Sequence, residues 1–446
     1  MDKTDSEGAE GSSSTTTSTK QEIKSNSSSA INIQPLETTL NPNTNTNTTN
    51  PNHEIPQTHT HRLSSLSSAL SHSQSQRSQR RPRRYSTDVG SILARHESII
   101  DASSLASIDR PPSDETKLPY TKIYHPYSFH VLALLAPASI FGVLARLGIQ
   151  ALVGYDEKSI FPLAWVQSMG CLCMGFALGI KEPLGQFYGP LYTALTTGFC
   201  GSLTTFSGWQ FDIFQSWLNP THANRDWLRD VIDGLSKSLF TLALSLSSVS
   251  FGAHLASLLL RSSKSRSIRL FSTVLPSNPP SKIIRYSLSI IALLSYLATI
   301  PIYFKLSPSF RHQATSSLLF SYPGTLSRYL LSINLNPLLK AFPLGTFTAN
   351  SCGTALLGIF HVCLGLGIVQ VSSNACDVLQ GLADGYCGCL TTVSTFAAEV
   401  DALEDWKAWR YVILSWVTAQ LLLLVILGTA YWGSGVSEQT TCVFSI

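Results

Sequence analysis

The chain reads GFCGSLTTFSGW at residues 198–209 and GYCGCLTTVSTF at residues 385–396. Each stretch lies inside a long apolar segment, and the two share the pattern Gly-x-Cys-Gly-x-Leu-Thr-Thr. Glycine lowers helix stability, and the backbone groups freed by a broken helix need polar partners inside a membrane. A break that occurs twice therefore predicts a duplicated membrane protein whose function resides at the breaks.

The composition excludes an ordinary soluble protein. Of the 446 residues 44% are hydrophobic and 13% are charged, whereas about 25% of the residues in a soluble domain are charged. Much of the charge lies near the N-terminus, and apolar runs of about 20 residues, the length that crosses a bilayer, follow it.

The N-terminal region, residues 1–125, predicts a disordered cytosolic tail. It is rich in Ser, Thr and Asn, as in TNTNTTNPN at residues 44–52, and such a composition buries too little apolar area to fold. The basic run at residues 80–84, followed by Ser86, is open to three interpretations: a kinase site, a lipid-attracting patch or a solvated basic tail.

Apolar runs predict nine membrane spans, which group as four, one and four. The first repeat covers 128–262, a linking helix covers 283–305, and the second repeat covers 318–433. The repeats align through Gly-x-x-x-Arg at 142–146 and 324–328. The predicted spans are 129–153, 160–180, 190–215, 235–260, 284–304, 318–334, 343–369, 376–400 and 411–432.

The odd number of spans predicts that the repeats are inverted. Four spans return the chain to its starting side, so the single linking helix turns the second repeat upside down. Lys and Arg are most frequent on the side of the N-terminus and of the 263–282 loop, which places both in the cytosol and the C-terminus outside. The predicted fold class is an all-α polytopic membrane protein of two inverted four-helix repeats joined by a linking transmembrane helix.

Catalysis is not expected. His254 and His361 lie within spans but outside the repeated motif, and the sequence has no P-loop and no dinucleotide fingerprint. The Cys-x-Cys pairs at 171–173 and 387–389 lack the supporting histidines of a zinc site, and we expect no disulfide framework. The chain is therefore predicted not to be an enzyme.

Polar donors, ring edges and buried cations instead predict an anion pathway. Aromatic edges attract a small anion weakly, side-chain amides donate hydrogen bonds, and arginine raises the local anion concentration. These groups are Phe206, Trp209, Phe396, Asn350, Gln167, Ser248, Ser415, Arg146 and Arg328.

Over residues 129–432 the sequence resembles the fluoride channels of the CrcB/Fluc type, and specifically the two-domain eukaryotic fluoride exporters. The resemblance rests on Gly-x-x-x-Arg, on the Asn-x-x-Gly of TANSCG, on the repeated break and on the linking helix. It implies a structural Na⁺ at the repeat interface, held by backbone carbonyls of Gly201, Thr204, Gly388 and Thr391.

The resemblance also implies two pores, each using the first Phe of one repeat and the second Phe of the other. This chain departs from that pattern, since Trp209 and Val393 each replace a Phe. We expect one working fluoride pore with Phe206, Phe396, Asn350, Ser415, Thr205 and Thr392. A degraded second pore is expected to contain Trp209, Val393, Gln167 and Ser248, and Arg146 and Arg328 are expected to charge the vestibules.

Three acidic residues lie near these positions. The family's acidic residue beyond the Phe box corresponds to Glu399, with Asp212 opposite. Asp384 has Thr197 as its counterpart, and it either adds negative charge near the sodium site or caps a broken helix.

The function implied is passive export of fluoride across the plasma membrane, driven by an inside-negative potential. Fluoride ion and membrane lipid are the expected partners, nucleic acid is not, and the chain is expected to work singly. An inverted-repeat antiporter of a small solute is the alternative, although it requires paired intramembrane carboxylates. A membrane scaffold is a third class.

Overall fold

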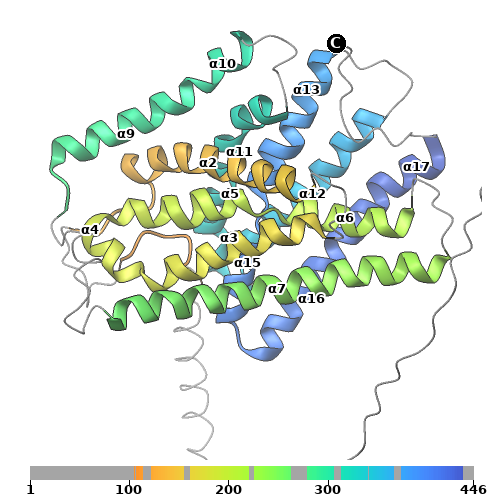
Figure 1. Cartoon of the computed structure of the whole chain (residues 1–446), viewed down its shortest axis with the longest axis horizontal. Helices are drawn as coiled ribbons and strands as arrows, with labels where there is room; N and C mark the ends of the chain where they lie inside the picture. The colour runs from red at the N-terminus through yellow and green to blue at the C-terminus, as the bar shows by residue number, and fades with distance from the viewer. Residues whose placement is uncertain are drawn as a thin grey trace, which may run out of the picture. The chain divides into compact units, whose positions relative to one another are not determined.

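A computed structural model of the chain describes residues 105, 107–113, 122–154, 161–219, 226–262, 279–305, 313–339, 341–365 and 373–434. All of them belong to one compact unit, residues 81–446. The described residues form helices and no strands (Figure 1), which confirms the all-helical prediction.

The first repeat contains four helical segments, of which the third is broken. Its elements are α2 (Phe129–Val153), α3 (Pro162–Gly179), α4 (Lys181–Thr193), η2 (Ala194–Cys200), α5 (Gly201–Leu203), α6 (Phe206–Leu218) and α7 (Trp227–Ser262). The linking region follows as α9 (Lys282–Leu297) and α10 (Thr299–Lys305).

The second repeat has the same order of elements. It consists of α11 (Gln313–Leu335), η4 (Asn336–Leu338), α12 (Leu344–Gly365), α13 (Ser373–Gly381), η5 (Leu382–Cys387), α14 (Gly388–Leu390), α15 (Ser394–Ala402), α16 (Asp405–Leu423), η6 (Leu424–Gly428) and α17 (Thr429–Ser434). The third helical segment is again the broken one.

Each of the nine predicted spans contains a described helical segment. Six helices in the described part of the chain are long and apolar enough to cross a membrane: 129–153, 162–179, 227–260, 282–305, 344–365 and 405–433. The other three segments are α11, with Pro323 in its interior, and the two broken segments. Breaks and polar residues shorten the apolar helical runs there, and these are the features that suit a site rather than an anchor.

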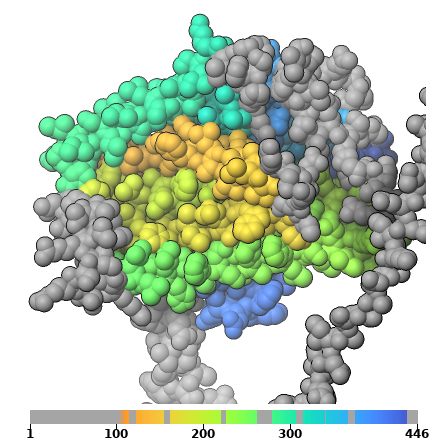
Figure 2. All heavy atoms as spheres, in the orientation of Figure 1, coloured from red at the N-terminus to blue at the C-terminus, as the bar shows by residue number. Residues whose placement is uncertain are grey.

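The helices pack through the repeats and across them. α3 lies along α7, α2 contacts η2, α9 and α11, and α12 contacts α11 and α16. Figure 1 shows α9 and α10 along one side of α2 and α7 along the opposite side. In Figure 2 the side chains of α2, α3 and α7 form consecutive bands over this face.

Glycine permits the close packing of α3 against α7. A Cβ atom on Gly175 of α3 would overlap the backbone of Val249, and a Cβ on Gly252 of α7 would overlap the backbone of Leu172. Each helix therefore offers a glycine to the other's backbone, as small residues do at membrane helix interfaces.

The distribution of polarity is that of a membrane protein. Large apolar side chains are exposed on α7, α9 and α16, whereas hydroxyl and amide side chains are buried between the helices. Ile291 on α9 is 62% exposed, while Thr204 and Gln167 are fully buried. Lipid, and not water, suits such an exterior.

Two expectations need correction. Leu105 and residues 107–113 and 122–125, assigned above to the disordered tail, are part of the helical body. Residues 1–104, 106 and 114–121 of that predicted tail lie outside the described residues. No disulfide framework was expected, yet Cys376 at the start of α13 is disulfide-bonded. Apolar contacts explain the first difference, since Ile108 is 5% exposed.

Candidate functional site at the two helix breaks

Both broken segments open at the Thr-Thr pair, as predicted. Thr204 has φ −90° and ψ 152°, and Thr391 has φ −95° and ψ 152°. Both are extended, so helix α5 ends at Leu203 and α14 ends at Leu390. A π-helical turn, η2 or η5, precedes each break, and such turns are frequent at functional sites.

Each break caps the helix that follows the other break. The hydroxyl of Thr391 accepts a hydrogen bond from the amide of Ser207 at 3.1 Å. The hydroxyl of Thr204 accepts from the amides of Val393 and Ser394 at 3.2 and 3.0 Å. The exchange satisfies N-terminal amides of α6 and α15 that lack helical partners, and it holds the two repeats together.

The same threonines meet in a buried hydroxyl cluster. Thr204 and Thr392 are 3.1 Å apart between hydroxyl oxygens, as are Thr205 and Thr391. The hydroxyl of Ser207 lies 2.9 Å from that of Thr391. The two copies of the motif, about 190 residues apart in sequence, therefore form one centre with a local twofold relation.

Side-chain amides hold the extended backbone of each break. Gln167 donates to the carbonyl of Thr205 at 2.7 Å and accepts from its amide at 3.2 Å. Asn350 does the same for Thr392, at 3.2 and 2.9 Å. Gln167 and Asn350 were predicted as donors of the anion pathway, and this support of the backbone was not predicted. Their equal position, one helix before each break, is the signal that could have indicated it.

The two arginines cross to the broken helix of the opposite repeat. Arg328 donates to the carbonyl of Thr197 at 2.5 Å, and Arg146 donates to the carbonyl of Asp384. The guanidinium of Arg328 packs on Gly201 and that of Arg146 packs on Gly388, where a Cβ atom would overlap it. Both arginines are nearly fully buried, which places their charges against the breaks.

The aromatic residues of the two motifs form one buried cluster. The ring centroids of Phe206 and Phe396 are 5.4 Å apart, and those of Phe206 and Trp209 are 5.6 Å apart. Val393 belongs to the same cluster. The structure thus brings Phe206 and Phe396 together, and it also keeps Trp209 beside Phe206.

Cavities flank this centre. A polar cavity of about 360 Å³ is lined mainly by α2, α6, α12 and η5, with single residues of α3, α14 and the first break. The lining residues are Arg146, Gln150, Leu163, Thr205, Ser207, Gly208, Phe211, Asp212, Gln215, Leu357, His361, Ala383, Asp384 and Gly388. An apolar cavity of about 260 Å³ lies on the other side of α6, between α7 and α16, and is lined by Phe206, Trp209 and Phe396. Of the two arginines, Arg146 borders the polar cavity.

The two matching acidic residues have different surroundings. Glu399 is buried and accepts hydrogen bonds from Thr346 at 2.6 Å, Tyr411 at 2.8 Å and Asn336 at 3.3 Å. Asp212 lies beside Lys237 in a cavity of about 160 Å³.

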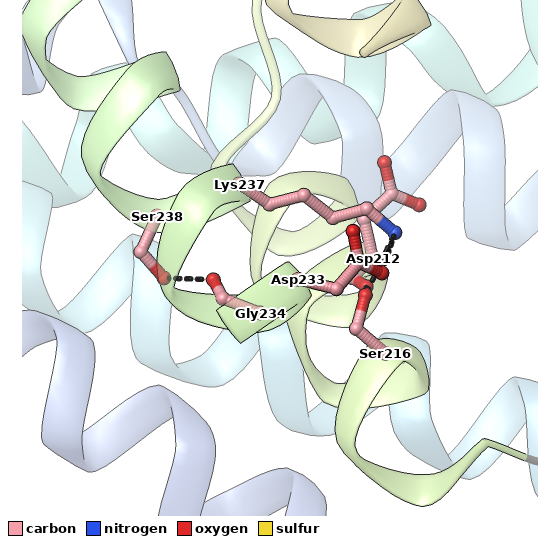
Figure 3. A network of polar contacts seen from close by, with 6 residues as sticks. All are labelled: Asp212, Ser216, Asp233, Gly234, Lys237 and Ser238. Atoms are coloured by element: carbon pink, nitrogen blue, oxygen red, sulfur yellow. Dashed lines mark hydrogen bonds and ion pairs between the residues drawn. The ribbon is translucent and has the colours of Figure 1, made fainter. Parts of the chain in front are cut away.

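The Lys237 side chain links several residues around Asp212. Figure 3 shows it reaching past Asp233 toward Asp212 and Ser216. Its ammonium donates to the hydroxyl of Ser216 at 2.7 Å and pairs with Asp233 at 3.4 Å. The N-terminal part of α7 therefore brings a cation to Asp212, while Glu399 has neutral donors.

The two predicted pathway serines differ as well. The hydroxyl of Ser248 lies 2.9 Å from that of Ser168 and so joins α7 to α3. The hydroxyl of Ser415 is buried without a hydrogen-bond partner among the described residues. A buried polar atom of this kind calls for a ligand or water, which suits a residue that faces a pathway.

The carbonyls at the breaks fit the oxygen ligands of a hard cation. The ψ of 152° turns the carbonyls of Thr204 and Thr391 out of the helical pattern, and Gly201 and Gly388 lie one turn earlier, where α5 contacts α14. Among the described residues no group of three or more His, Cys, Asp or Glu side chains could hold a metal ion. Backbone oxygens are suitable donors for a hard cation.

Comparison with known proteins gives matches in both repeats. The family model described as CrcB-like protein, camphor resistance (CrcB), matches residues 133–253 and again 315–429. Fluoride export protein 1 of Neurospora crassa is 32% identical over 69% of this chain and 68% of its own length. Fluoride export protein 1 of Candida albicans is 30% identical over 71% and 82%, respectively.

A shorter bacterial relative matches one part of the chain. The fluoride-specific ion channel FluC of Escherichia coli is 36% identical over 24% of this chain and 83% of its own length. No solved structure matches the chain significantly. A protein the size of one repeat and a family model that matches twice both indicate duplication.

Proposed function

The chain belongs to the CrcB-like protein family, and on that premise we propose that it exports fluoride through a channel at the paired helix breaks. The observation that carries this proposal is the buried contact of Phe206 with Phe396, directly beside the cluster where the two Thr-Thr breaks meet. Ring edges and hydroxyl donors attract a small anion without a base or a nucleophile.

The proposed channel has nine spans, with the second repeat inverted relative to the first. The crossed caps and the crossed arginines support this arrangement, because each contact in one repeat has its counterpart in the other. The disulfide at Cys376 supports an extracellular position for the start of α13, because disulfides persist in oxidising compartments. The N-terminus is then cytosolic and the C-terminus extracellular.

The proposed channel has one working pore, with Phe206, Phe396 and Ser415. Trp209 and Val393 stand where the second pore would have its rings. Trp209 donates its indole N–H to the carbonyl of Lys237 at 3.2 Å, so it is tied to α7 and serves packing. Asn350 and Gln167 act here as supports of the break, through the backbone of Thr392 and Thr205.

A structural Na⁺ at the repeat interface would be held by carbonyls of Gly201, Thr204, Gly388 and Thr391. Bound there, it would supply positive charge that joins the two breaks. The extended backbone of Thr204 and Thr391 supports this proposal, because it frees their carbonyls from the helical hydrogen-bond pattern. The residues therefore fit the cation by donor type.

Export in this scheme is passive and needs no catalytic step. An inside-negative potential supplies about 2.3 kcal/mol per charge for each 100 mV, enough to expel an anion that enters as neutral hydrogen fluoride. A plasma-membrane location accords with this use of the potential. The contact between the two breaks within one chain supports a chain that works singly. The antiporter alternative has no comparable support.

Growth on fluoride tests the proposal. The chain should restore growth of a fluoride-sensitive cell on fluoride plates, whereas Asn350→Asp should not, because a carboxylate cannot donate to the carbonyl of Thr392. The variant's membrane abundance is measured alongside. Growth that does not depend on the chain, or equal rescue by Asn350→Asp at equal abundance, would contradict the proposal.

A further inference from the structure

A short N-terminal segment, Leu105 with residues 107–113, lies inside the helical body and is called here the inner segment. Ile108 packs in a buried cluster with Met174, Cys200 and Ala398. The hydroxyl of Tyr192 donates to the carbonyl of Ile108 at 3.1 Å. Lys181 donates to the carbonyl of Ser107 at 2.8 Å.

The carboxylate of Asp109 stands next to the first break. Asp109 is 3% exposed and accepts a hydrogen bond from the hydroxyl of Thr197 at 2.9 Å. The carbonyl of the same Thr197 accepts from Arg328 at 2.5 Å. One oxygen of Asp109 and one guanidinium nitrogen of Arg328 are buried without a hydrogen-bond partner among the described residues.

The segment is also anchored where it leaves the body. Arg110 donates to the carbonyl of Ile333 at 2.8 Å, at the end of α11. Pro111 and Pro112 lie against Gly189 of α4, within 3.8 Å of where its Cβ would be. The contacts thus run from α15 and α3 to α11 and α4, across one end of the first break.

A cavity lies at the position that corresponds, by the alignment of the two repeats, to the site of the inner segment. Its arginine is Arg146, which borders the polar cavity of about 360 Å³. There Asp384 occupies the position of Thr197 and so carries an acid on the broken helix itself. Phe211 and His361 stack at 4.1 Å between ring centroids in that cavity wall.

The residues around the inner segment differ from those at the twofold-related cavity. The cavity beside Arg146 has Phe211 and His361 in its wall, and the aligned residues beside the inner segment are Ala398 and Leu178. Both belong to the cluster that surrounds Ile108. Ala398 is smaller than Phe211 and leaves room for Ile108, while Leu178 offers it an apolar contact in place of an imidazole. Thr197, without an acid of its own, donates to the carboxylate of Asp109.

We propose that the inner segment is a plug that closes the inner end of the anion pathway beside Arg328, with the carboxylate of Asp109 in the place of a passing anion. The helix that Ile108 touches, α15, also carries Phe396 and Glu399. Leu105 belongs to the same buried cluster as Phe396. The identity of the anion rests on the proposed fluoride function, whereas the closure itself does not.

The experiment uses the full-length chain with two substitutions. Asp109→Arg places a second guanidinium beside that of Arg328, so the two repel, and Asp109→Asn is the milder change. Ser113→Arg, at an exposed position, is the matched control for the added charge. Cys200 is fully buried under Ile108 and reports displacement through labelling by a water-soluble maleimide in detergent. Its counterpart Cys387, also fully buried, is the internal control.

The same variants are measured for potential-driven fluoride efflux from proteoliposomes. We expect Asp109→Arg to make Cys200 reactive while Cys387 stays shielded, and to raise the efflux rate severalfold, with Asp109→Asn intermediate. Ser113→Arg should match the wild type. A peptide of sequence SLASIDRPPS, residues 104–113, added from the cytosolic side should lower the raised efflux.

Reactive Cys200 with unchanged or lower efflux would overturn the plug, because the segment would then be a structural support. Cys200 that stays shielded in both Asp109 variants would overturn it as well. Absence of fluoride efflux from the wild type and from every variant would contradict the proposed function instead, while the Cys200 labelling would still decide whether the segment is displaced.

Discussion

At the residue scale, the two copies of the repeated motif differ in a few side chains. Phe206 and Phe396 keep their rings and lie 5.4 Å apart, while the aligned positions are Val393 and Trp209. Trp209 is held by its hydrogen bond to the backbone of Lys237. The rings that meet at the centre therefore come from different repeats, one from each motif.

Replacement of these rings should have unequal effects. Phe206→Ala or Phe396→Ala should abolish fluoride resistance, because each removes a ring edge from the working pore. Trp209→Ala should reduce it much less. Growth on fluoride is the measurement, and melting in detergent controls for the loss of about 3–5 kcal/mol of packing that each truncation brings. Equal loss of resistance in all three variants would contradict a single pore.

At the scale of the element, the broken helices depend on one another. The first Thr of each break caps the helix after the other break, and an arginine of each repeat packs on a glycine of the other. Gly201 and Gly388 need to be glycine because a methyl group would overlap the guanidinium of Arg328 or Arg146. The breaks are therefore built by the pair of repeats together.

Alanine at these glycines should destabilise the protein. Gly201→Ala and Gly388→Ala should each cost about 1–3 kcal/mol, because an added methyl in a packed site forces its neighbours to move. Gly148→Ala is the control, since a Cβ there meets nothing within 4 Å; it should gain about 0.5–1 kcal/mol from helix propensity. Thermal unfolding in detergent measures all three, and a similar loss at Gly148 would refute the contact argument.

At the scale of the whole molecule, the proposed inversion of the second repeat depends on the linking region, α9 and α10. α9 packs along α2 with an apolar outer face, in accordance with a spanning helix. If it crosses the membrane, the second repeat is inverted, and the two breaks meet at the same depth from opposite sides. Symmetric contacts such as Arg146 with Asp384 and Arg328 with Thr197 then arise from the duplication itself.

Cysteine labelling in cells should reveal the inversion. Single cysteines at Thr221 and Ser309 should react with a membrane-impermeant maleimide from outside, whereas one at Ser272 should react only after permeabilisation. Peptide mass spectrometry identifies the labelled positions against the native cysteines. A Ser309→Cys variant shielded in intact cells would mean that the linking helix does not cross and that the repeats are parallel.

The sequence by itself determined the duplication, the helical segments and the position of each break. Apolar run length, glycine and threonine act within a few turns, so the break after Leu203 and the break after Leu390 could be read directly. The alignment of the two motifs also singled out Phe206 and Phe396 as the rings that would meet.

Only the tertiary structure decided which groups contact one another across the repeats. These contacts join residues far apart in the chain: the crossed threonine caps, the arginine on the opposite broken helix, and the insertion of Ile108 and Asp109 between the repeats. The sequence around residues 107–113 predicts a polar tail, because the space beside Ala398 that Ile108 fills is formed by helices distant in the chain. Such contacts depend on how whole helices pack against one another. Local sequence patterns, which act within a few turns, do not reveal that packing.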